Sequence, residues 1–150
     1  MDTSILCNLL GVPGKCQDRE KVIGELKRKR ENRECDLLLP VTAIIETGNH
    51  IAQLSDGRVR RTCAERLSGV LRTVVDGTAP WALNEVEWGA EHLRALISGG
   101  STGSTLVEHA CNQLGCGDLN ILVERDRYLA RTSGVAATVW TLDELLASYA

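Results

Sequence analysis

Four acidic residues stand where a predicted strand ends or a predicted helix begins. Asp2 opens the segment MDTSIL, and Glu46 lies one turn into the helix predicted after LLLPV. Asp118 follows the glycines of GCGDLNIL, and Asp143 follows the predicted strand VAATVW. Carboxylates that gather in a cleft repel one another, and a hard divalent cation such as Mg²⁺ or Mn²⁺ relieves that repulsion. The pattern therefore predicts a metal site built from these side chains.

Each of these carboxylates also has a structural interpretation. Asp118 behind glycines and Asp143 beside Thr141 suit helix N-caps, where Asp is common. Glu46 suits the first turn of a helix, and Asp2 suits a frayed chain end. Taken alone, each acid favours the structural interpretation. The joint pattern favours a shared site, because several of the acids recur at the same position after a strand.

The elements that must position these acids are predicted from apolar patterning. The run 37–41 is typical of a strand buried on both faces of a parallel sheet, and 135–140 is a second predicted strand. Helices are predicted over 17–33, 42–54, 58–76, 85–97, 105–114 and 119–131, with a last one opened by a capping box from Thr141 to Glu144. The predicted fold class is therefore α/β, a three-layer α/β/α domain with a short, mainly parallel central sheet. Such sheets bind ligands beyond the carboxyl ends of their strands.

Length and composition favour a single globular domain over residues 1–150. Hydrophobic residues make up 43% and charged residues 25%, which suits a chain that buries a core. The net charge of −3 excludes a generally basic polyanion binder, so nucleic acid must be contacted through a local patch. No apolar run is long enough to span a membrane, and the first residues lack the basic region of a signal peptide. We therefore expect a cytoplasmic protein without membrane contact.

Several other chemistries find no support in the sequence. The six cysteines contain no C-x-x-C pair, so neither a sulfur-ligated metal nor a disulfide framework is expected. A Ser or Cys nucleophile with His and Asp cannot be assembled at a recognisable spacing, and no phosphate-binding P-loop is present. The glycine-rich loop over 98–104 is predicted to be flexible, and Glu124 and Asp126 are predicted to be solvated.

The order and context of the acids resemble the PIN domain family of metal-dependent nucleases. The family pattern is an N-terminal Asp-Thr/Ser, a Glu in a helix after the second strand, and two later Asp residues. The matching stretches are MDTSIL, LLLPVTAIIETGNHI, GCGDLNILVERDRYL and VWTLDELL, which span nearly the whole chain. The resemblance implies that these acids are catalytic and hold one or two Mg²⁺ or Mn²⁺ ions, which activate water for phosphodiester hydrolysis.

Other polar residues lie close to the acids in the sequence. Thr3, Ser4 and Thr141 could each bring a hydroxyl or a backbone amide to the phosphate or the metal, although capping of a helix is an equal alternative. His50 follows Glu46 by four residues and shares its helix face, so it could orient the carboxylate. A histidine that simply packs is the alternative at this position.

Two basic clusters are candidates for phosphate contacts. Arg58, Arg60 and Arg61 open a predicted helix and are the preferred nucleic-acid-binding residues. A second cluster runs from Lys27 to Arg30 and includes Arg33. In each case the alternative is an ordinary solvated helix face.

The resemblance also implies a biological setting. It implies an endoribonuclease, with DNA left open as a substrate, that acts as the toxin of a toxin-antitoxin pair, forms a homodimer and is held by an antitoxin or other regulatory protein. A catalytically silent PIN-like binding or assembly module is the alternative. A third hypothesis is an unrelated α/β domain in which all four acids cap helices. Metal binding separates these hypotheses, because a capping acid has no need of a cation.

Overall fold

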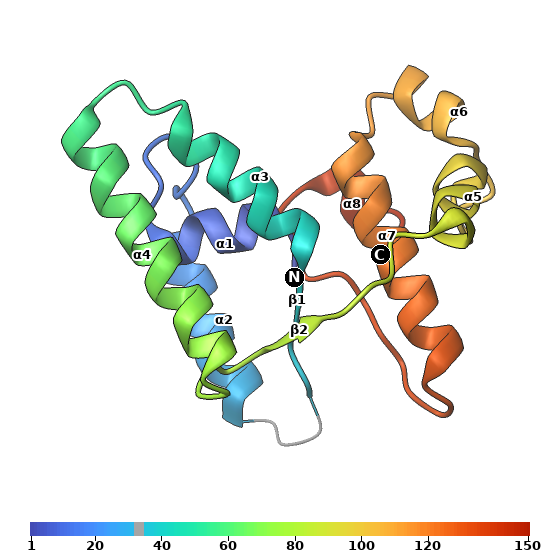
Figure 1. Cartoon of the computed structure of the whole chain (residues 1–150), viewed down its shortest axis with the longest axis horizontal. Helices are drawn as coiled ribbons and strands as arrows, with labels where there is room; N and C mark the ends of the chain where they lie inside the picture. The colour runs from blue at the N-terminus through green and yellow to red at the C-terminus, as the bar shows by residue number, and fades with distance from the viewer. Residues whose placement is uncertain (32–34) are drawn as a thin grey trace. The chain divides into compact units, whose positions relative to one another are not determined.

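The computed structural model describes residues 1–31 and 35–150, which divide into two compact units. The first unit consists of Met1 and residues 3–84, and the second consists of Asp2 and residues 85–150. Figure 1 shows the helices and strands that form them. That residues 1–150 act as one domain stays a prediction.

The first unit is built mainly from helices. Its elements are α1 (Thr3–Leu10), α2 (Arg19–Glu31), β1 (Leu38–Pro40), α3 (Val41–Ala52), α4 (Gly57–Val75) and β2 (Ala82–Asn84). Helix α1 packs against α2, α3 and α4, and β1 pairs in parallel with β2 (Figure 1). Ile5, Leu6, Val22 and Leu39 are fully buried and form part of its core. Of the helix predicted over 17–33, residues 32 and 33, and with them Arg33, lie outside the described residues.

Local sequence explains where two of these helices begin. Helix α4 begins after Asp56, whose carboxylate accepts hydrogen bonds from the backbone N–H groups of Arg58 and Val59 at 2.8 and 3.0 Å. Helix α3 begins directly after β1, with Pro40 in extended geometry at the N-cap position. Thr42, the first residue of the helix predicted over 42–54, lies inside the first turn of α3.

The second unit is arranged around α7 (Cys116–Arg131). Helices α5 (Ala90–Ser98) and α6 (Leu106–Cys111) pack against it, and the short helix α8 (Glu144–Ala147) follows near the end of the sequence. The core of this unit gathers side chains from α7, α8 and the segments beside them: Leu114, Leu119, Ile121, Leu122, Val139 and Leu146.

The predicted fold class, a three-layer α/β/α domain with a short, mainly parallel central sheet, is wrong. The structure is 59% helical, and its described residues contain one sheet of two parallel strands, β1 and β2. The strand predicted over 135–140 forms no ladder in the described part of the chain. Its apolar side chain Val139 is buried in the helical core of the second unit instead. A short apolar run shows only that a segment is buried, and here helices rather than neighbouring strands bury it.

Two predicted helix boundaries also differ from the structure. The gap between the helices predicted over 105–114 and 119–131 lies earlier in the structure, because α6 ends at Cys111 and α7 begins at Cys116 with Gly115 as its N-cap residue. The capping box expected from Thr141 to Glu144 does not form, because Asp143 caps α8 and accepts a hydrogen bond from the Leu146 N–H at 2.8 Å.

The glycine-rich loop over 98–104 is tied to α7 by hydrogen bonds. The backbone N–H of Ser101 donates to Oδ2 of Asp126 on α7 at 2.8 Å. Within the loop, the hydroxyl of Thr102 donates to the Gly99 carbonyl at 2.8 Å. Gly99 has a φ of +80°, which suits a residue without a side chain. The loop is therefore held against α7 by specific contacts.

No helix within residues 1–31 and 35–150 has both the length and the apolar character that a bilayer crossing requires.

Candidate carboxylate site

Asp2 is a buried, ordered side chain with only 2% of its surface exposed. Its backbone N–H donates to the Trp140 carbonyl at 3.0 Å, which fixes the main chain. Its carboxylate Oδ2 accepts a hydrogen bond from the hydroxyl of Thr141 at 2.7 Å. These contacts lie within the second unit and hold the carboxylate in one position, so the frayed end considered from the sequence is not what the structure shows.

Asp143 belongs to the same unit and is linked to Asp2 through Thr141. The Thr141 oxygen that donates to Asp2 also accepts the backbone N–H of Asp143 at 2.8 Å. The Asp143 side chain is exposed, and its Oδ1 caps α8. The interpretation of Asp143 as a helix cap is therefore confirmed for Oδ1. The Thr141 hydroxyl also connects Asp143 with Asp2.

Asp118 lies in the first turn of α7 and is half-buried. Its Oδ2 would stand 3.3 Å from a Cβ atom placed on Gly115, so the side chain folds back toward the N-cap residue. An acid in this position interacts favourably with the positive end of the helix. Within the described residues, no group of three or more His, Cys, Asp or Glu side chains is arranged to hold a metal ion.

Glu46 belongs to the first unit, where it is half-buried on α3. The hydroxyl of Thr3, itself 8% exposed, donates to Glu46 Oε2 at 2.6 Å. His50 lies one turn further along α3 and is half-buried. The carbonyl of Ser4 accepts a hydrogen bond from the Asn8 side chain at 2.9 Å. Thr3 is thus a predicted supporting residue that contacts Glu46.

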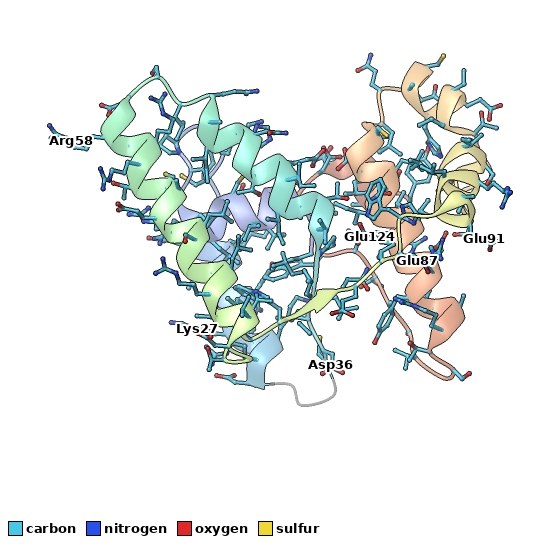
Figure 2. The ribbon with its side chains drawn as sticks, in the orientation of Figure 1. Lys27, Asp36, Arg58, Glu87, Glu91 and Glu124 are labelled. Carbon is cyan, nitrogen blue, oxygen red and sulfur yellow. The ribbon has the colours of Figure 1, made fainter. Side chains whose placement is uncertain are left out.

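The three arginines at the start of α4 differ in the hydrogen bonds and ion pairs that their side chains form. Arg60 Nη1 donates to the Leu54 carbonyl at 2.8 Å, and Arg61 forms an exposed ion pair with Glu65 at 2.9 Å. The side chain of Arg58 has no hydrogen-bond or ion-pair partner among the residues that the structure describes, and Figure 2 shows it extending outward from the start of α4. Arg58 is therefore the one of the three whose guanidinium is free for a phosphate.

A buried polar chain in the second unit was not predicted. The ring Nε2 of His92 lies 2.7 Å from Asn120 Oδ1, and Asn120 Nδ2 donates to Glu124 Oε1 at 2.8 Å. All three side chains are at most 2% exposed, so the prediction of a solvated Glu124 is wrong. The available signal was the spacing of Asn120 and Glu124, which are four residues apart on a helix whose neighbouring positions are apolar.

Comparison with models of protein families, with curated proteins and with solved structures gives no significant match to this chain.

Proposed function

We propose that this chain is a divalent-metal-dependent nuclease that hydrolyses phosphodiester bonds, with Asp2 as a metal ligand. The observation that carries the proposal is the buried Asp2 carboxylate held by the Thr141 hydroxyl at 2.7 Å. The Thr141 hydroxyl fixes the orientation of this carboxylate oxygen in a buried position. A carboxylate held in one orientation is prepared to bind a cation without first having to be ordered. We therefore take Asp2 as the first residue to test as a metal ligand.

The donor chemistry of this unit fits a hard cation. Asp2 contacts the Thr141 hydroxyl through its carboxylate, and Asp143 contacts the same oxygen through its backbone N–H. Both residues carry carboxylate oxygens, which are the donors that Mg²⁺ and Mn²⁺ prefer. When bound, such an ion lowers the pKa of a coordinated water and supplies the nucleophile for hydrolysis. The part of Thr141 is to hold Asp2 in one orientation. Asp118 and Glu46 enter the proposal through the sequence pattern, and mutation tests each of them separately.

The substrate, the biological role and the regulation of the chain are also part of the proposal. The motifs that resemble PIN nucleases favour RNA as the substrate, with DNA as the alternative. The same resemblance supports a role as the toxin of a toxin-antitoxin pair, a homodimer, and control by a small regulatory protein. These proposals depend on the metal-dependent activity and are worth testing after it.

A cleavage assay tests the proposed function directly. Labelled RNA and DNA of the same sequence are incubated with the chain in the presence and absence of Mn²⁺. We expect Mn²⁺-dependent cleavage that leaves a 5′-phosphate on the downstream fragment. Asp2→Asn should abolish cleavage and weaken Mn²⁺ binding, while Asp76→Asn, which removes one exposed carboxylate at the end of α4, should change neither.

The same assay evaluates the other acids and the main alternative. Glu46→Gln and Asp118→Asn should each reduce cleavage while leaving the chain folded, because each removes a charge at nearly constant volume. A folded parent chain that neither binds Mn²⁺ nor cleaves either strand would contradict the proposal. Nucleic-acid binding without cleavage in that case would favour the silent binding module.

A further inference from the structure

Two guanidinium groups converge beside the end of α1. Arg19 opens α2 and Arg66 lies in the middle of α4, yet both reach Gly11, which follows α1 directly. A Cβ atom placed on Gly11 would stand 3.2 Å from Arg66 Nη1 and 3.4 Å from Arg19 Nε. Three segments of the first unit therefore bring two positive charges to within 3.4 Å of one point.

Gly11 is what allows the two arginines to approach so closely. It has a φ of +67° and ends α1 in a Schellman motif, in which the Val12 N–H donates to the Cys7 carbonyl and the Gly11 N–H donates to the Asn8 carbonyl. The backbone conformation thus favours glycine. The absence of a side chain lets the two arginine side chains lie directly over Gly11.

Neither guanidinium is neutralised by a carboxylate. In the part of the chain that the structure describes, no ion pair involves Arg19 or Arg66, although Asp18 and Glu20 flank Arg19 in the sequence. Glu65, next to Arg66, is paired with Arg61 instead. Both arginines are exposed, so a ligand could reach them from solvent.

Capping of α1 accounts for only part of this arrangement. Arg66 Nη1 donates to the Leu10 carbonyl at 2.8 Å, which is a favourable contact for a cation at a helix C-terminus. The end of a helix carries roughly half a negative charge, whereas two full positive charges converge there. Arg19 makes no hydrogen bond through its side chain within the described residues, so capping gives no reason for its position.

We infer that Arg19 and Arg66 form a binding site for a phosphate group. A guanidinium presents its N–H groups as a planar fork that matches two phosphate oxygens, and two such groups that lie over the same residue suit a tetrahedral oxyanion bound from the solvent side. The charge of the phosphate also relieves the repulsion between the two arginines. The site lies entirely in the first unit and is independent of the proposed metal site, so either can fail without the other.

The source of the phosphate is either a free phosphate or the backbone of a nucleic acid. Both present the same oxyanion, and two ligands distinguish them. The first is inorganic phosphate, titrated against chloride at equal ionic strength. The second is a short single-stranded DNA, titrated without divalent cations so that it stays intact. Binding is measured by calorimetry for phosphate and by fluorescence anisotropy for the labelled strand.

The variant Arg19→Gln is the main test, because the Arg19 side chain makes no hydrogen bond or ion pair with the residues that the structure describes. We expect it to weaken phosphate affinity about tenfold, the loss that follows from one charge-assisted hydrogen bond. Arg66→Lys keeps the charge and a donor for Leu10 but loses the fork, so it should weaken phosphate as well. Arg72→Gln, an equal loss of charge elsewhere on α4, is the matched control and should bind as the parent does.

The two titrations have distinct outcomes. If Arg19→Gln weakens only inorganic phosphate, the site takes a free phosphate. If it weakens the DNA strand as well, the site takes a backbone phosphate. The inference is overturned if Arg19→Gln changes neither affinity, or if Arg72→Gln lowers both as much as Arg19→Gln does.

Discussion

The Thr141 hydroxyl donates a hydrogen bond to the Asp2 carboxylate at 2.7 Å, although 139 positions separate the two residues in the sequence. The same oxygen accepts the backbone N–H of Asp143 at 2.8 Å. The turn that starts α8 therefore sets the orientation of an acid encoded near the beginning of the sequence. This makes Thr141 the residue through which the proposed site is most directly tested.

Replacing Thr141 by Val removes the hydroxyl at nearly constant shape. It leaves the buried Asp2 carboxylate without this donor and Asp143 N–H without its acceptor, so unfolding by urea should show a loss of about 1 to 3 kcal/mol. Mn²⁺ binding should weaken as well, because Asp2 is no longer oriented. Thr141→Ser retains the hydroxyl and should restore both properties. Equal Mn²⁺ affinity in the Val and Ser variants would show that Thr141 has no part in positioning a ligand.

Arg58→Gln should weaken nucleic-acid binding more than Arg61→Gln does. The Arg58 side chain has no partner within the described residues, whereas Arg61 is already paired with Glu65. Each lost contact to a single strand lowers the salt dependence of binding by about 0.7 in slope. Binding measured over a series of salt concentrations checks this. If the triple replacement of Arg58, Arg60 and Arg61 leaves the slope as it is in the parent, the start of α4 is an ordinary solvated surface.

Gln113→Gly should stabilise the chain. Gln113 has a φ of +66° at the end of α6, where Leu114 N–H donates to the His109 carbonyl in the same motif that Gly11 completes for α1. A side chain in this conformation costs about 1 to 2 kcal/mol, partly offset by the greater freedom of glycine in the unfolded chain. We expect a net gain of about 0.5 to 1 kcal/mol in chemical denaturation. Gln113→Ala keeps the strain and should show no such gain.

Stability should fall at acid pH partly through Asp56. The backbone N–H groups of Val59 and Arg58, in that order of effect, hold the pKa of Asp56 below its ordinary value. The carboxylate therefore stabilises the folded chain above the ordinary pKa of aspartate, and this contribution is lost as the pH falls through the lower, folded pKa. Asp56→Asn retains a cap without a charge. Urea unfolding at neutral and acid pH should therefore show a smaller pH dependence in this variant than in the parent.

Long helices with clear periodicity were predictable from the sequence. The segment 58–76 was predicted from its apolar stripe and corresponds to α4, and 119–131 lies within α7. Strand β1 was predicted from the run that includes Leu38 and Leu39. In each case the signal is local, because the apolar side chains that become buried lie within the element itself.

What the sequence could not predict depends on partners distant in the chain. Strand β2 has two exposed residues, Ala82 and Leu83, and it is a strand only because β1 lies beside it. His92 and Asn120 are joined across 28 positions, and neither residue alone indicates a buried chain. The acids themselves could be picked out by type and spacing. The pairing of hydroxyls with carboxylates could not be predicted, because each pair is distant in the sequence. Thr3 binds Glu46, and Thr141 binds Asp2.

The assignment of Asp2 to the second unit has a consequence for protein synthesis. A ribosome makes Asp2 long before it makes Trp140 and Thr141, because 138 and 139 positions separate them in the sequence. The backbone bond to Trp140 and the side-chain bond from Thr141 therefore cannot form on a nascent chain that stops short of residue 141. If Asp2 serves the proposed hydrolysis, a fragment that ends before Thr141 should therefore lack this activity.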